Sequence, residues 1–271
     1  MEWALPHVLP LLVAGGFTVG LLVGLTGVGA GSLTTPFLIS IIGVNPVLAV
    51  GTDLLFACIT KSSSAWHHHR LNNVDYRILG WLALGSLPGA LLVFLGLWLS
   101  GVNTAALAGL IRIVLAIALI ISAIAIACYP YIASRFSGGK LSGGEQGDGM
   151  TAVPRPELTF FLGVVIGITV ALTSVGAGAI GVVVLTALYP ALAMRRLVGT
   201  DVVHAIPLTL VAGLGHLSFG HVDLSLLATL LAGSVPGIAL GTRLTGILPD
   251  RVLRMMLAAI LCLAAYTLWI K

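Results

Sequence analysis

The chain has 271 residues, of which 58% are hydrophobic and only 8% are charged. Soluble domains carry about 25% charged residues, so this composition excludes an ordinary soluble protein and indicates an all-α polytopic membrane protein. A β-barrel is disfavoured because the apolar runs are long and continuous. The formal net charge of +4 fits basic cytoplasmic loops, and we expect no nucleic-acid partner.

The first half of the chain, residues 1–130, contains five predicted apolar segments and is interpreted as a first transmembrane repeat. About 20 apolar residues are needed to cross a bilayer as a helix, and the second segment is too short to do so comfortably. The five segments cover residues 6–26, 31–44, 47–66, 77–99 and 105–130.

A cytoplasmic linker is predicted over residues 131–156, because this stretch is rich in Gly and Ser and carries charges of both signs. The second half, residues 157–271, again divides into five segments, and its second segment is again short. These segments cover residues 157–173, 178–189, 197–217, 224–246 and 251–270.

Four sequence blocks recur in the same order in the two halves, which indicates an internal duplication. The offset is 147 residues for the first block and 148 for the others. The matched blocks are "GLTGVGAG" (24–31) with "ALTSVGAG" (171–178), "GTD" (51–53) with "GTD" (199–201), "HHRLNNVD" (68–75) with "HLSFGHVD" (216–223), and "GSLPGALL" (85–92) with "GSVPGIAL" (233–240).

The odd number of segments in each half predicts that the second repeat is inverted relative to the first. With the N-terminus outside, ten of the thirteen Lys and Arg residues fall in or beside the loops after segments three, five, seven and nine. These loops are then cytoplasmic, as the positive-inside rule requires. The sequence therefore predicts two inverted-topology repeats with both termini outside.

The two short segments each begin at a Gly-x-Gly, which predicts a pair of broken helices at a midplane substrate site. Broken backbone in a membrane must line a cavity or be buried in protein, and a helix that starts there directs free amides at an anion. The alternative is that the glycines only allow close helix packing. The residues assigned to this site are Gly29, Gly31, Ser32, Thr34, Gly176 and Gly178, with Thr35 as a further hydroxyl.

Each GTD block places a carboxylate, Asp53 or Asp201, inside an apolar segment. Ionisable side chains in membrane spans are costly and usually functional. Asp53 and Asp201 are therefore assigned to coupling, as proton carriers or cation ligands. The alternative is helix capping, if the third and eighth segments begin near Thr52 and Thr200.

Further polar residues complete the predicted site. Thr52, Thr200, Lys61 and His204 are added as substrate-binding residues. Lys61 has a second interpretation, because its long side chain could snorkel to the cytoplasmic edge. His68 and His216 are assigned to a gate or entrance, and no metal site is expected.

The matched blocks together resemble the sulfite exporter TauE/SafE family of membrane transporters. The resemblance covers about residues 20–265 and includes "GLTGVGAGSLTTPFL", "HHHRLNNVDYRIL", "SVGAG" and "GHLSFGHVD". It implies transport of sulfite, sulfonates or other small sulfur-containing anions, without a cofactor. The chain departs from the family pattern at Asp53 and Asp201, where a neutral polar residue is common, and in "AIGVVVL" after the second Gly-x-Gly.

The leading hypothesis is a secondary transporter, not an enzyme, that moves a small sulfur-containing anion by alternating access, with proton coupling as an option. We expect it in a bacterial or archaeal cytoplasmic membrane. The expected partners are the anion and the lipid bilayer, with a homodimer as a further option. Two alternatives stay open: a cation transporter that uses Asp53 and Asp201, and an intramembrane metal-dependent hydrolase that uses the histidines.

Overall fold

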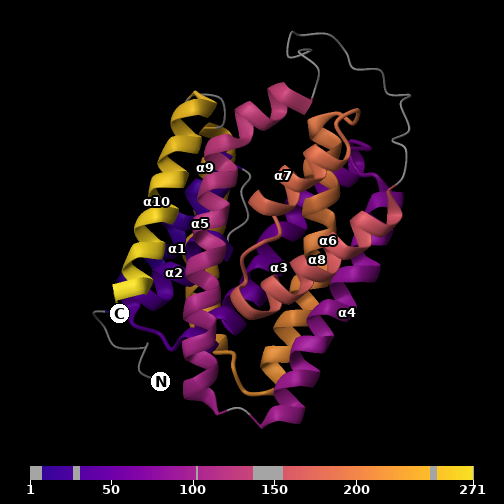
Figure 1. The fold of residues 1–271 in the computed structure, drawn as a ribbon. Helices are drawn as coiled ribbons and strands as arrows, with labels where there is room; N and C mark the ends of the chain where they lie inside the picture. Colours follow the sequence, from indigo (N-terminus) through magenta and orange to yellow (C-terminus); the bar gives the residue numbers. More distant parts are fainter. Residues whose placement is uncertain (1–7, 27–30, 102, 137–154, 245–248, 271) are drawn as a thin grey trace.

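The computed structural model describes residues 8–26, 31–101, 103–136, 155–244 and 249–270, and within these ranges it is a bundle of helices without strands (Figure 1). Eight of the described helices are long and apolar enough to cross a membrane. Two shorter apolar helices, Gly31–Ile42 and Ala179–Leu188, lie between them. The predicted all-α polytopic class is confirmed.

The helices follow the predicted segments closely, with the largest differences at helix ends. The helix predicted to end at residue 130 continues to Phe136, which is six residues into the predicted linker. In the first half the helices are α1 (Val8–Thr26), α2 (Gly31–Phe37) with its π-helical continuation η2 (Leu38–Ile42), α3 (Pro46–Arg70), α4 (Tyr76–Ser100) and α5 (Thr104–Phe136). In the second half they are α6 (Pro156–Thr173), α7 (Ala179–Leu188), α8 (Met194–Ser218), α9 (Leu224–Leu244) and α10 (Asp250–Ile270).

Two aspartates outside the apolar segments begin α4 and α9 by capping them. Asp75 Oδ1 accepts hydrogen bonds from the backbone amides of Arg77 and Ile78 at 3.1 and 3.2 Å. Asp223 Oδ1 accepts from the amides two and three residues further on, at 2.8 and 3.0 Å. Partial burial opposes ionisation of Asp223, but these amides and the Ser225 hydroxyl hold its pKa below the ordinary value.

Helices α3 and α8 pack together at the centre of the bundle. In their most apolar stretches 65% and 61% of the residues are buried, against 22–44% in the other six long helices. Figure 1 shows α5 and α10 on one side of the bundle and α4 and α6 on the other. Polar side chains on α3 and α8 are therefore shielded from lipid by the surrounding helices.

The outer helices pair across the two halves, α1 with α9 and α4 with α6. Both pairs approach closely at glycines, as in many membrane helix pairs. A Cβ at Gly85 would overlap the carbonyl oxygen of Phe160, and a Cβ at Gly233 would overlap that of Val13. The second contact is the repeat counterpart of the first, so the same packing occurs twice with the halves exchanged.

The same reciprocity holds where α3 and α8 meet the turns before α9 and α4. A Cβ at Gly51 would overlap the carbonyl oxygen of His221, and a Cβ at Gly199 would overlap that of Asn73. Such exchange of partners is what the predicted inverted repeat requires. The inversion and the orientation in the membrane stay predictions.

Candidate functional site

The two short helices begin where the Gly-x-Gly pattern predicts. Helix α2 starts at Gly31, and Gly178 is the N-cap residue of α7. Gly176 and Gly178 have φ angles of +135° and +130°, which residues with a side chain rarely adopt. The glycines of this motif therefore shape the backbone before α7. Gly29 of the first motif lies outside the described residues.

Asp53 and Asp201 occupy the same position, the eighth residue of α3 and of α8. The helices begin at Pro46 and Met194, about two turns earlier, so these carboxylates do not cap α3 and α8. The capping alternative is wrong because both helices extend past the Gly-Thr pairs toward the preceding turns. The two side chains are 0% and 1% exposed.

Asp53 is held by hydroxyl groups from the first turn of α2. Thr35 Oγ1 donates a hydrogen bond to Asp53 Oδ2 at 2.5 Å, and the side chains of Thr34 and Ser174 lie near the same carboxylate. Ser32 and Thr34 are also buried at the start of this helix. Thr34 and Thr35, two of the predicted hydroxyls of α2, therefore lie at Asp53.

Asp201 lies against the first turn of α7, but without such donors. A Cβ added to Gly181 would overlap Asp201 Oδ1, which places the carboxylate directly on this turn. Neither oxygen has a hydrogen-bond partner among the described residues. The repeat explains the difference, because Gly181 and Val182 stand where α2 has Thr34 and Thr35.

Lys61 brings one buried positive charge that acts on both carboxylates. Its side chain is 8% exposed, and its Nζ donates a hydrogen bond to the carbonyl oxygen of Ala177 at 3.2 Å. Its ammonium group interacts electrostatically with both Asp53 and Asp201. The snorkelling alternative is wrong, because the lysine is directed inward to the loop before α7. Its repeat counterpart is Thr209, so the charge is unique to the first half.

His204 lies one turn after Asp201 and is fully buried. Its Nε2 forms a hydrogen bond of 2.7 Å with Ser86 Oγ on α4, while Nδ1 has no partner among the described residues. Sequence reasoning did not select Ser86 or Gly181. The serine could have been found, because it recurs in the matched "GSLPG" and "GSVPG" blocks.

Four other predicted site residues contact neighbouring backbone, and two of them hold the turns at the ends of α3 and α8. Thr52 Oγ1 accepts the backbone amide of Asp223 at 3.1 Å, and Thr200 Oγ1 accepts that of Asp75 at 2.8 Å. His216 Nε2 donates to the carbonyl oxygen of Ala171 at 2.9 Å. His68, the counterpart of His216, lies close to the backbone of Gly199.

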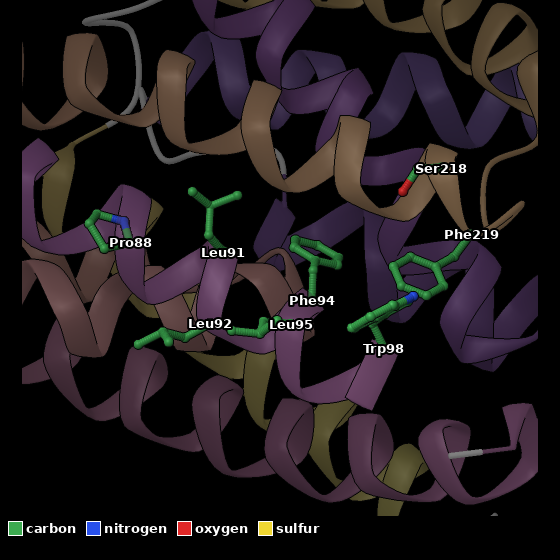
Figure 2. Close-up of a pocket in the computed structure, with 8 residues that line it drawn as sticks. All are labelled: Pro88, Leu91, Leu92, Phe94, Leu95, Trp98, Ser218 and Phe219. Carbon is green, nitrogen blue, oxygen red and sulfur yellow. The ribbon is translucent and has the colours of Figure 1, made fainter. Parts of the chain in front are cut away.

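Two hollows lie away from the buried carboxylates. One, with a volume of about 710 Å³, is polar and is lined by Asn72, Asn73, Arg195 and Arg196 where α3 ends and α8 begins. The other is an apolar groove of about 670 Å³ between α4 and the end of α8. Figure 2 shows that leucines and aromatic side chains surround it, so it offers nothing to hold an anion.

The buried residues Asp53, Lys61, Asp201 and His204 define what we call the central cluster. Buried charges are costly unless other charges or hydrogen bonds compensate them, and here the Lys61 ammonium interacts electrostatically with both carboxylates. Among the described residues, no group of three His, Cys, Asp or Glu side chains is placed to hold a metal ion. The central cluster thus combines carboxylate, ammonium and imidazole groups, which are able to exchange protons.

Comparison with known proteins gives one family and several relatives. The profile of the family described as Sulfite exporter TauE/SafE matches residues 12–268. The probable membrane transporter protein YjnA of Bacillus subtilis (strain 168) is 37% identical over 253 residues, which cover 93% of this chain and 96% of the relative. The probable membrane transporter protein YdhB of the same organism is 25% identical over 251 residues, which cover 90% and 93%.

A third relative is a probable membrane transporter protein of Methanocaldococcus jannaschii, 27% identical over 278 residues that cover 96% of this chain and 95% of the relative. No solved structure matches the chain. Together with the eight long apolar helices, these relatives indicate a multi-pass protein of the cell membrane.

Proposed function

We propose that this chain, which belongs to the sulfite exporter TauE/SafE family, is a secondary transporter for a small sulfur-containing anion. The substrate class is sulfite, a sulfonate or a similar organosulfur compound. The family fits a membrane transporter rather than an enzyme, and no cofactor is needed for the activity. A homodimer is part of the proposal only as an option.

The observation that carries the proposal is Lys61, an ammonium group buried at the loop before α7 that interacts electrostatically with two buried carboxylates. A buried cation attracts an anion far more strongly than an exposed one does. Gly178 provides no side-chain cap for α7, and the amides of Gly181 and Val182 bond to the backbone carbonyls of Gly176 and Gly178. The partial positive charge of this helix end adds to that of Lys61.

Charge balance favours proton coupling. With all three groups ionised, Asp53, Asp201 and Lys61 carry a net charge of −1. A bound monoanion would make the net charge of this buried site −2, which is costly. One proton taken up by a carboxylate restores the original charge, so each anion is expected to move together with a proton.

Alternating access is supported by the reciprocal contacts of the two halves. The short helices α2 and α7 would form the midplane site of an inverted repeat, and rocking of one half against the other would open it to either side. The buried state of Asp53 and Asp201 fits a closed conformation between two open ones. Both termini lie outside in this proposal.

A cation transporter is the alternative, with Asp53 and Asp201 as ligands. Lys61 argues against it, because a fixed ammonium beside the carboxylates already supplies the positive charge that a metal ion would bring. The electrostatic contact of Lys61 with both aspartates therefore favours the anion.

The proposal is tested by uptake of labelled sulfite into proteoliposomes, with protein-free liposomes as the control. Unlabelled sulfite, thiosulfate, taurine and sulfoacetate are added as competitors, and sodium, potassium and magnesium as chloride salts. We expect competition by at least one of the sulfur anions and none by the cations beyond that of chloride. Inhibition by a cation, with no effect of any anion, would reverse the assignment.

A further inference from the structure

The two carboxylates of the central cluster stand at matched positions but in unequal surroundings. Thr35 donates a hydrogen bond to Asp53 at 2.5 Å, whereas Asp201 has no hydrogen-bond partner on either oxygen among the described residues. Both are buried to the same degree. Hydrogen bonds to a carboxylate favour its charged form, so only Asp53 is stabilised as an anion by fixed donors.

The surroundings of Asp201 leave Lys61 as its main source of positive charge. Helices α3, α4, α6 and α7 pack against α8. Helix α7 carries no titratable side chain, and those of α6 and α4 lie in the first turn of each helix, at Glu157, Tyr76 and Arg77. Helix α3 contributes Asp53, Lys61 and, near its end, His68, whose Nδ1 lies beside Gly199. Helix α8 itself contributes His204 one turn after Asp201 and Arg196 five residues before it. Of these groups, Lys61 is the one whose positive charge acts on Asp201.

We propose that Asp201 alone carries the coupling proton and that Lys61 alternates between Asp201 and the transported anion. In the empty site the Lys61 ammonium compensates the Asp201 carboxylate. An arriving anion engages the ammonium, and Asp201 then binds a proton from the water that entered with the anion. On the other side the anion leaves, the proton returns to water, and Lys61 again faces the carboxylate. Asp53 stays ionised throughout.

This inference rests on the proposed function and assigns the roles of Asp53, Lys61 and Asp201 within it. It also explains why the repeat lost its symmetry at three positions. Hydroxyls at 34 and 35 hold one carboxylate, their replacement by Gly181 and Val182 leaves the other without donors, and the single lysine at 61 has Thr209 as its counterpart. Two identical carboxylates would compete for the same proton, whereas unequal ones give a fixed stoichiometry.

The first test separates net transport from exchange in proteoliposomes. Net sulfite uptake driven by a pH gradient requires a proton carrier, whereas exchange of labelled for unlabelled sulfite does not. Asp201→Asn should lower net uptake by at least about tenfold and abolish the accompanying pH change, while exchange stays within about threefold of wild type. Asp53→Asn should keep the pH change for every anion moved.

The second test uses two isosteric changes that are expected to fold. Val182→Thr offers Asp201 the hydroxyl that Thr35 offers Asp53, so the pH midpoint of net uptake should move to lower pH by about one unit. Thr35→Val is the matched control: the side chains of Thr34 and Ser174 remain near Asp53, so Asp53 should stay ionised and the midpoint should be unchanged. The first change favours the ionised form of the proton carrier, and the second affects a group that does not titrate.

The outcomes are distinct. A midpoint that moves in Thr35→Val and not in Val182→Thr would overturn the assignment, as would a pH change that persists in Asp201→Asn. If Asp201→Asn also loses exchange, the two isosteric variants decide between the carboxylates. Absence of any sulfur-anion flux in the wild type would instead refute the proposed function itself.

Discussion

Replacing Gly181 by alanine is the most local test of how α7 and Asp201 fit together. The new Cβ would overlap Asp201 Oδ1 and would lie 3.2 Å from the carboxylate carbon. To reach an ordinary nonbonded separation the carboxylate must move by about 1 Å. A displacement of this size at a reacting or binding group can cost about 100-fold, so we expect sulfite uptake to fall by up to that factor.

The measurement is initial uptake in proteoliposomes together with the melting temperature in detergent. Gly80→Ala is the matched control, because a Cβ there meets nothing within 4 Å and alanine favours a helix by up to about 1 kcal/mol. Gly181→Ala should lose uptake and Gly80→Ala should not. Equal uptake in the two variants would refute the contact between Asp201 and α7.

Three further predictions concern the ends of the helices. Thr52→Val and Thr200→Val each leave a backbone amide without its hydroxyl partner, so each should lower the free energy of unfolding by about 1–3 kcal/mol. The measurement is the melting temperature, which should fall; an unchanged melting temperature would contradict these contacts. The double variant Arg195→Gln/Arg196→Gln should raise the KM for the anion by about threefold to tenfold at low salt and much less at high salt. An increase in KM that does not depend on salt would exclude an electrostatic role for the polar hollow. Asp223→Ala should lower the free energy of unfolding by about 1 kcal/mol at pH 7. Because the folded-state pKa of Asp223 is lowered, this contribution is present above about pH 4 and is lost as the pH falls through the folded pKa. An equal loss of stability at pH 7 and pH 3 would contradict the capping role.

Sequence reasoning predicted the number and order of the helices because each one is marked by a long apolar run. It also placed the breaks before α2 and α7, since the duplicated Gly-x-Gly pattern requires unusual backbone. The starts of α3 and α8 were predicted at residues 47 and 197, within three residues of Pro46 and Met194, where the helices begin. Only the capping alternative required later starts, near Thr52 and Thr200.

The central cluster was predicted in its parts but not in its arrangement. Asp53, Asp201 and Lys61 stood out because charges in apolar segments are rare. Their pairing with α2, α7 and the Ala177 carbonyl depends on how distant helices pack, which no local pattern contains. The hydroxyls of Thr52 and Thr200 were assigned to substrate, whereas the structure uses them to hold the turns before α9 and α4.

The central claim is that a buried ammonium group binds the transported anion, and Lys61→Met tests it most directly. A hydrogen bond to a charged group contributes about 1.5–3 kcal/mol, which corresponds to a loss of about tenfold to 150-fold in affinity. The measurement is the concentration dependence of labelled sulfite uptake in proteoliposomes, with the melting temperature as a check on folding. We expect the KM for sulfite to be raised by at least about tenfold in the folded variant. Equal KM values and equal flux in Lys61→Met and wild type would contradict it.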